Sequence, residues 1–135
     1  MSYSFLGDVP RERKRLIVAM AALASIVLVL NSLGNAGHFY QADFGYDKIV
    51  HFAAGAFCGV FGIWLFHPSG AMRERWWAIS AAFILSFWIG GGWEVYEIIY
   101  DQPDLTTLTY WDDTLTDMVA DVLGGVLAGT MYRER

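Results

Sequence analysis

Ionisable side chains occur in this sequence inside stretches that are otherwise apolar. Asp47 and His51 are four residues apart, and Glu94 and Glu97 are three residues apart. Three aspartates follow at intervals of four: Asp113, Asp117 and Asp121. Since residues three or four apart share one face of an α-helix, each group forms a polar stripe on its helix. Such groups are costly at membrane depth, so they indicate a functional site.

One imidazole surrounded by several carboxylates is a plausible ligand set for a divalent metal. Oxygen-rich ligation with a single imidazole suits Mg²⁺, Mn²⁺, Ca²⁺ or Fe²⁺, and Zn²⁺ also fits. Without a metal, carboxylates so close together would repel and some would stay protonated. We therefore expect a metal site whose candidate ligands are Asp47, His51, Glu94, Asp117 and Asp121. A spare carboxylate would serve as the base, and the candidate catalytic residues are Glu94, Glu97 and Asp113.

Four apolar segments are available to position these stripes. A bilayer core of about 30 Å needs about 20 mostly apolar helical residues. We predict spans over residues 16–33, 49–66, 76–97 and 114–131. The last is the weakest, because Asp117 and Asp121 interrupt its first half. The sequence thus predicts an all-α integral membrane protein, a four-helix bundle that forms one domain over residues 1–135.

Composition supports the membrane assignment and excludes other classes of protein. Hydrophobic residues make up 56% of the 135 residues and charged residues only 17%, against about 25% charged in soluble domains. The net charge of −5 and the lack of a basic stripe argue against a nucleic-acid partner. One cysteine, Cys58, excludes an intrachain disulfide framework and is expected to be a packing residue.

The first apolar segment has some features of a secretory signal. A basic run precedes it and small residues follow it. Its uncharged stretch is long for the apolar region of a signal peptide, and the sequence begins at Met1. We therefore expect an uncleaved membrane anchor.

Charge is divided between the two sides of the predicted bundle. Eight of the nine basic residues fall on one side: Arg11, Arg13, Lys14, Arg15, Arg73, Arg75, Arg133 and Arg135. The positive-inside rule makes this side cytoplasmic, with both termini on it. The other side carries ten acidic residues and Lys48, a charge of −9 against +4 on the basic side. We predict a multi-pass protein of the bacterial inner membrane whose carboxylate cluster faces away from the cytoplasm.

Small residues extend two of the polar stripes. One face combines His51, Gly55 and Gly59, and another combines Asp121, Gly125 and Gly129. Such faces allow transmembrane helices to approach closely, so the polar groups should point at other helices. The same faces are equally suited to hold two copies of the chain together as a homo-oligomer. A run of three glycines, residues 90–92, should loosen or break the third span beside Glu94, where a ligand could enter.

Structural roles are the alternative for several of these residues. Asp112 or Asp113 is favoured as the N-cap of the last helix. Asp47 and Glu97 are equally compatible with the headgroup layer. His38 is expected to be a solvated loop residue, and His67 is expected to have a structural role. A buried network that only orders the helices is the alternative for the centre of the cluster: His51, Glu94, Asp117 and Asp121.

Three stretches together resemble a known family. They are YDKIVHFAAGAF (46–57), GGWEVYEI (91–98) and YWDDTLTDMVADVLGG (110–125). In this order they resemble the YjdF-type family of small bacterial inner-membrane proteins and, more distantly, the VanZ-like family. The positions that match the YjdF-type pattern are Asp47, His51, Glu94, Glu97, Trp111, Asp113, Thr114 and Asp117, whereas Asp112 and Asp121 depart from it. The resemblance covers the last three spans and implies the fold and the site but no particular reaction.

Three functions are compatible with this pattern. The first is a metal-dependent hydrolase or transferase that acts at the outer leaflet on a lipid headgroup or a lipid-linked substrate. The second is ion or proton handling along the carboxylates. The stripes stop halfway through the membrane, so a complete route would need an oligomer. The third is a structural or accessory protein. Against the enzyme, only Lys48 is available on the acidic side to neutralise a phosphate.

Overall fold

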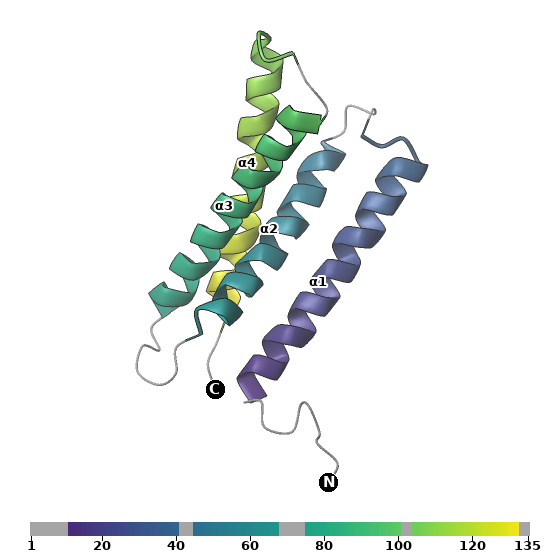
Figure 1. Ribbon diagram of the computed structural model, residues 1–135. Helices are drawn as coiled ribbons and strands as arrows, with labels where there is room; N and C mark the ends of the chain where they lie inside the picture. The colour runs from purple at the N-terminus through teal and green to yellow at the C-terminus, as the bar shows by residue number, and fades with distance from the viewer. Residues whose placement is uncertain (1–10, 41–44, 68–74, 101–103, 133–135) are drawn as a thin grey trace.

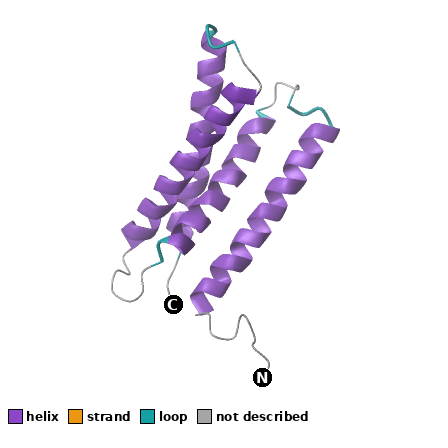
Figure 2. Ribbon diagram, in the orientation of Figure 1, coloured by secondary structure: helices purple, strands orange, loops and turns teal. Residues whose placement is uncertain are grey.

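The computed structural model describes residues 11–40, 45–67, 75–100 and 104–132, and all regular structure in these ranges is helical (Figure 2). The helices are α1 (Arg11–Ala36), α2 (Tyr46–Leu65), α3 (Arg75–Tyr100) and α4 (Leu108–Met131). The all-α prediction is confirmed. Each predicted span lies largely within one helix, but α4 begins well before residue 114.

The helices run up and down in chain order, and three of them form the core of the molecule (Figure 1). α2, α3 and α4 pack against one another, with α4 in close contact with both of the others. α1 packs along α2, and in the described part of the chain its backbone does not approach α3 or α4. The arrangement is therefore a three-helix core with α1 packed along α2, and Leu16 of α1 belongs to the apolar core.

The two ends of the molecule differ in charge. At one end of the molecule, α2 and α4 begin and α3 finishes. We call it the acidic end, because it carries Asp47, Glu97 and Asp113. The opposite end, where α1 begins and α4 finishes, carries the basic run from Arg11 to Arg15 and is called the basic end. Since successive helices alternate in direction, the start of α1 and the end of α4 lie at the same end.

Three helices are long and apolar enough to cross a membrane. They are α1, α2 and residues 76–100 of α3, with α1 the most apolar at a mean hydropathy of 2.5. Apolar side chains such as Val18 and Leu28 are about two-thirds exposed on α1, as expected for a surface that contacts lipid. α4 has 24 residues, long enough to cross, but carries four aspartates. It packs against both α2 and α3, and Asp117 and Asp121 are buried there.

Glycines allow the backbones of α2 and α4 to touch. Gly55 lies against the backbone of Asp121, and Gly124 lies against the carbonyl oxygen of Phe52. A Cβ at Gly59 would lie only 2.7 Å from the Cα of the facing glycine in α4. The small-residue faces of the sequence are thus used within one chain, as close helix contacts require. A second copy of the chain would have to pack on other surfaces.

Ser86 ties α3 into the same contact. Its side chain is fully buried, and its hydroxyl lies 2.9 Å from the carbonyl oxygen of Gly55 and 2.8 Å from that of Ala82. The hydroxyl therefore links α3 to α2 at the level where α4 also crosses. Buried hydroxyls between transmembrane helices commonly serve this purpose.

The three consecutive glycines do not interrupt α3. The helix is continuous from Arg75 to Tyr100, so the expectation that residues 90–92 loosen or break it is wrong. A side chain at position 90 would collide with Asp121, because a Cβ there would lie 2.5 Å from Oδ2 of that residue. Gly92 has open space around its missing side chain. The first glycine therefore makes room for a carboxylate of α4.

The start of α4 also differs from the prediction. Thr107 is the N-cap residue, so Asp112 and Asp113 lie inside the helix and the N-cap role expected for them is wrong. In the preceding turn, Asp104 accepts hydrogen bonds from the Thr106 hydroxyl (2.6 Å) and backbone N–H (3.0 Å). These bonds hold the pKa of the Asp104 carboxyl below its usual range. The turn that they fix starts the helix early enough for Asp113 to reach α2.

The helix contact can be tested with a matched pair of glycine variants. Gly124→Ala should destabilise the protein by about 1–3 kcal/mol or more, because the added methyl group meets the backbone of α2. Gly92→Ala should be neutral or gain up to about 1 kcal/mol from helix propensity. Thermal unfolding of the purified protein in detergent, followed by circular dichroism, measures both. Equal effects of the two variants would contradict the close contact.

Candidate functional site

His51 lies at the centre of the polar cluster, near the acidic end of α2. The residue is only 7% exposed, and its two ring nitrogens face different carboxylates. Nδ1 lies 3.1 Å from Oδ2 of Asp121. Nε2 lies 3.7 Å from Oδ1 of Asp47 and 3.9 Å from Oδ1 of Asp117. The imidazole therefore joins two acidic residues of α4 to one of its own helix.

This geometry favours one tautomer of the imidazole. In the neutral imidazole, a carboxylate at hydrogen-bond distance from Nδ1 places the proton on that nitrogen and leaves the lone pair on Nε2, whereas a doubly protonated ring would donate towards the carboxylates on both sides. Ligand atoms of Asp47, His51 and Asp117 all lie within 4.8 Å of one another. Metal–ligand bonds of about 2.0–2.2 Å place tetrahedral donor atoms about 3.4 Å apart, so some of these side chains would have to move closer together to bind one ion. Asp47, His51 and Asp117 are therefore the described residues whose side chains could meet at one metal ion, while Asp121 contacts the other ring nitrogen of the histidine.

Lys48 lies among the same carboxylates. Its Nζ is 2.5 Å from Oδ1 of Asp113, 2.6 Å from Oδ1 of Asp117 and 3.6 Å from Oδ2 of Asp47. Three aspartates thus surround the ammonium group, and Asp121, which contacts His51, is the fourth aspartate of the cluster. With a neutral imidazole the cluster carries a formal charge of −3. Bound protons or a further cation would have to balance this charge, because isolated charges are costly away from water.

Glu94 brings α3 to the edge of the cluster. The residue is 5% exposed, and its Oε1 has no hydrogen-bond partner among the described residues. Thr114, Asp117 and His51 are close enough to interact electrostatically or directly with its carboxyl group. Glu97, one turn further on, accepts a hydrogen bond of 2.8 Å from the indole N–H of Trp93. The two glutamates therefore have different surroundings.

The structure brings together most of the residues predicted for a metal site. Asp47, His51 and Asp117 converge, with Glu94 beside them. Asp121 is also in the cluster, but it contacts Nδ1 and not the nitrogen that faces the other two carboxylates. Of the other predicted catalytic residues, Asp113 has a mostly exposed side chain that pairs with Lys48, and Glu97 contacts Trp93.

Sequence reasoning gave no place in the cluster to Lys48. A signal was available, because Lys48 precedes His51 by three residues and follows Asp47 directly. That spacing places a cation on the helix face that carries the histidine. Its reach to two aspartates of α4 depends on how far apart the helices lie, which spacing alone does not give.

The remaining histidines lie away from the cluster. His38 is exposed in the turn after α1, in a left-handed conformation with φ of 55°. His67 is at the basic end, where its Nε2 lies 3.1 Å from the hydroxyl of Tyr132 and 4.0 Å from Oε2 of Glu12. It links the end of α2 to the ends of α4 and α1, which supports its structural role. Cys58 is buried, as expected for a packing residue.

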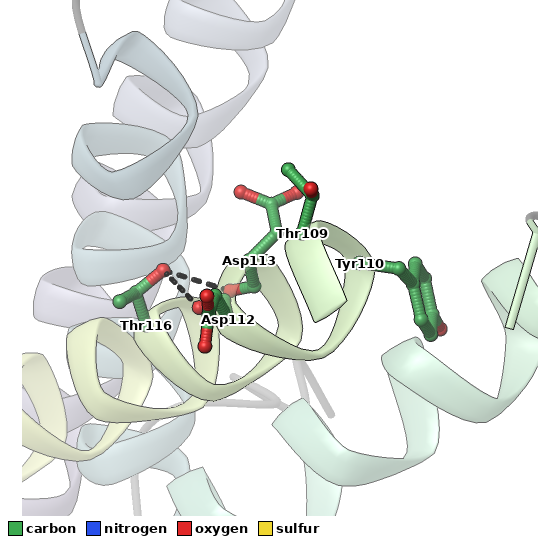
Figure 3. Close-up of a pocket in the computed structure, with 5 residues that line it drawn as sticks. All are labelled: Thr109, Tyr110, Asp112, Asp113 and Thr116. Carbon is green, nitrogen blue, oxygen red and sulfur yellow. Dashed lines mark hydrogen bonds between the residues drawn. The ribbon is translucent and has the colours of Figure 1, made fainter. Parts of the chain in front are cut away.

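A surface hollow adjoins the cluster at the beginning of α4 (Figure 3). It is lined by Thr109, Tyr110, Asp112, Asp113 and Thr116. The hydroxyl of Thr116 is hydrogen bonded to the backbone carbonyls of Asp112 (3.0 Å) and Asp113 (2.8 Å), so it is not directed to a ligand. The carboxyl group of Asp113 projects beside Thr109, and the ring of Tyr110 projects in a different direction. Asp113 thus connects the hollow to Lys48.

Comparison with known proteins now identifies the family. Residues 9–135 match the family described as "Predicted membrane protein (DUF2238)". The chain belongs to this family. An uncharacterized protein of Thermotoga maritima is 33% identical over 122 residues, an alignment that covers 84% of this chain and 61% of the relative. The chain therefore spans about three fifths of the length of that relative. No solved structure matches the chain.

Membership of this family agrees with the apolar helices. The family description and three long apolar helices both indicate a membrane protein. Neither description names a reaction, a metal or a substrate. The match does not name the YjdF-type or the VanZ-like family, and nothing in it supports the latter. The function must therefore be inferred from the site.

The role of Lys48 in the cluster can be tested by removing its charge. Lys48→Met should destabilise the protein by roughly 2 kcal/mol, because the buried Asp117 loses its ammonium partner. The loss should be smaller than for breaking a fully buried ion pair, because the side chain of Lys48 is partly exposed. Asp113→Asn removes an exposed partner of the same lysine and should cost less than about 1 kcal/mol. Thermal unfolding in detergent with a chelator present compares the two variants. A larger loss from Asp113→Asn would contradict this assignment.

Proposed function

We propose that this protein is a divalent-metal-dependent membrane enzyme, a hydrolase or transferase that acts on a lipid headgroup or a lipid-linked substrate. One observation carries the proposal. Asp121 holds Nδ1 of His51, while Nε2 faces carboxylate oxygens of Asp47 and Asp117. A carboxylate that holds the second nitrogen of a histidine is the usual partner of a metal-bound imidazole.

Charge supports the same proposal. The cluster has a formal charge of −3 beside a buried glutamate, and a divalent cation would remove most of that excess. The mixed ligands, one imidazole and carboxylate oxygens, suit Mn²⁺, Fe²⁺ or Zn²⁺, and also Mg²⁺ or Ca²⁺ if water completes the shell. The metal would supply an activated water or polarise a phosphoryl oxygen.

The surrounding residues suit a phosphorylated substrate better than the sequence alone suggests. The only cation predicted on the acidic side, Lys48, is inside the cluster, 2.6 Å from Asp117. An ammonium group in that place can neutralise a phosphate next to the metal. Glu94, Glu97 and Asp113 remain candidates for the base that accepts a proton from water.

The location of the cluster determines on which side of the membrane the proposed site would bind its substrate. We infer from the positive-inside rule that the basic end is cytoplasmic, with both termini there, and that the acidic end faces out of the bacterial inner membrane. The resemblance to the YjdF-type family, which consists of small inner-membrane proteins, agrees with this location. The site would then lie at the level of the outer headgroups.

Metal content gives the direct test of the proposal. Purified wild-type protein should carry about one divalent metal per chain, measured by inductively coupled plasma mass spectrometry. His51→Ala should lose the metal because it removes the central ligand. Asp121→Asn should weaken metal binding about 10–100-fold, because it removes the carboxylate that holds the imidazole ring in one orientation.

A matched control is available at the other end of the molecule. His67→Ala also removes a partly buried imidazole, but one that contacts Glu12 and Tyr132 at the basic end. Its metal content should stay at the wild-type value. Wild-type protein without stoichiometric metal, or equal losses from His51→Ala and His67→Ala, would refute the metal site.

Orientation can be tested by labelling single cysteines. In a Cys58→Ala background, Asp112→Cys should react with a membrane-impermeant maleimide in intact spheroplasts, because Asp112 is exposed at the acidic end. Arg15→Cys, exposed near the start of α1, should react only after lysis. The opposite pattern would place the acidic end in the cytoplasm.

A structural role is the second candidate, and the ion pairs of Lys48 favour it. A lysine bound to Asp113 and Asp117 already links α2 to α4 without a metal. Such a network would order the helices by itself. Metal-free wild-type protein of full stability would support this candidate.

A transport route finds less support. The core at the basic half of the molecule is apolar, formed by Leu16, Val60, Ile63, Ala78 and Ala82. Among the described residues, the buried cluster in this half of the core contains no ionisable side chain that would extend the polar stripes towards the basic end. Ion or proton transfer across the membrane would need a polar path there.

A further inference from the structure

Three buried polar atoms lack partners at the contact between α3 and α4. They are Oε1 of Glu94, Oγ1 of Thr114 and the hydroxyl oxygen of Tyr110, and none has a hydrogen-bond partner among the described residues. More than nine in ten buried polar groups in proteins are paired. The Thr114 hydroxyl still interacts with the Glu94 carboxyl group, whereas Oε1 of Glu94 and the Tyr110 hydroxyl lack a partner, which indicates one that is not part of the described chain.

The three atoms belong to one region. Tyr110, Thr114 and Asp117 are spaced by four and three residues, which places them on one face of α4. The carboxyl group of Glu94 on α3 lies beside Thr114. The surface hollow at the start of α4 reaches Tyr110, whose ring is turned away from Asp112 and Asp113 (Figure 3). The rest of the hollow lies on a neighbouring face of α4, so a ligand would reach the unpaired atoms beside the hollow and not through it.

The electrostatics define the chemistry of the missing partner. The charged or titratable groups that act on Glu94 are Glu97, Asp117 and His51, and no described lysine or arginine forms an ion pair with it. In its ionised form, a carboxylate in such a place is stabilised best by a hydrogen-bond donor that carries positive charge. Two hydroxyl oxygens and one carboxylate oxygen offer three acceptors, and a primary ammonium group has three N–H donors.

The neighbouring lysine shows the same kind of recognition. The ammonium group of Lys48 lies between Asp113 and Asp117, 2.5 Å and 2.6 Å from their oxygens. A second ammonium group beside Glu94 would be held in a similar way. The helix ends that carry these residues lie where lipid headgroups are expected, and exposed Trp93, Tyr100 and Trp111 mark that level.

We propose that Glu94, Thr114 and Tyr110 form a subsite for the primary ammonium group of a zwitterionic lipid, a phosphatidylethanolamine-type headgroup. The ammonium group lies on the unpaired atoms, and the phosphate lies towards Lys48 and the proposed metal. The phosphate half rests on the proposed function, whereas the ammonium half rests on the unpaired atoms alone. Glu94 is then a substrate-binding residue, and Glu97 and Asp113 remain as candidate bases.

Binding of short-chain lipids tests this assignment. Wild-type protein in detergent is titrated with dihexanoyl phosphatidylethanolamine, phosphatidylcholine or phosphatidylglycerol, and tryptophan fluorescence gives the dissociation constants. We expect phosphatidylethanolamine to bind about tenfold more tightly than phosphatidylcholine, because a trimethylammonium group has no N–H to donate. Glu94→Gln should reduce this preference to about twofold or less, because it removes the charged acceptor.

Control variants separate this role from a general charge effect. Asp112→Asn removes one negative charge from the same end of α4 and should keep the preference. Tyr110→Phe and Thr114→Val each remove one acceptor and should reduce it by an intermediate factor, which keeps the test decisive if Glu94→Gln does not fold. Equal binding of the two lipids by wild type, or an unchanged preference in Glu94→Gln, would overturn the subsite.

Two further arms separate the ligand source and the metal. Free phosphoethanolamine should compete poorly, and competition as strong as that of the lipid would overturn the assignment to a lipid headgroup. The titrations are repeated after treatment with EDTA and with added Mn²⁺. A preference that persists in protein without stoichiometric metal supports the subsite and refutes the metal. Metal binding without any preference supports the metal and refutes the subsite.

Discussion

The close contact between the backbones of α2 and α4 is the constraint on which the polar cluster depends. Gly55 touches the backbone of Asp121, and Gly124 touches the backbone of Phe52. His51 precedes Gly55 by one turn, so the distance between its Nδ1 and the Asp121 carboxylate is set by how near the helices come. A side chain at either glycine would separate the helices and lengthen this contact. The glycines therefore set the hydrogen bond between His51 and Asp121, and in the neutral imidazole the tautomer follows that hydrogen bond.

The two halves of the core use different interactions as a result. The basic half is held by small and branched apolar residues, including Ile63 and Ala82, which are fully buried. The acidic half buries His51, Glu94, Asp117 and Asp121, which are costly to place there without partners. Ion pairs and hydrogen bonds among these groups offset that cost only in part, since Glu94 keeps an unpaired oxygen. Under the proposed function, stability and function would compete in the same half, as is common at sites that bind charged ligands.

Residue spacing predicted which groups share a face, and the structure agrees for Asp47 with His51 and for Asp117 with Asp121. It did not predict what each face meets. The contact of Asp121 with Nδ1 and the reach of Lys48 to α4 depend on the rotation and separation of two helices, which a single sequence does not contain. The packing face of α1 could not be predicted from the sequence either, because a helix that is apolar on all sides has no polar stripe that distinguishes its buried face. The early start of α4 depends on a local turn at Asp104 that the apolar pattern does not register.

The ion pair between Lys48 and Asp117 has a consequence for metal binding. The oxygen of Asp117 that faces Nε2 of His51 is the same Oδ1 that contacts the lysine ammonium. A metal bound to that oxygen would repel the ammonium, while Asp113, at 2.5 Å, would keep it near the cluster. Lys48 would then remain next to the metal with one carboxylate partner fewer, and its free donors would be available to a phosphate. Under the proposed function, the same lysine stabilises the cluster without a metal and binds substrate when the metal is present.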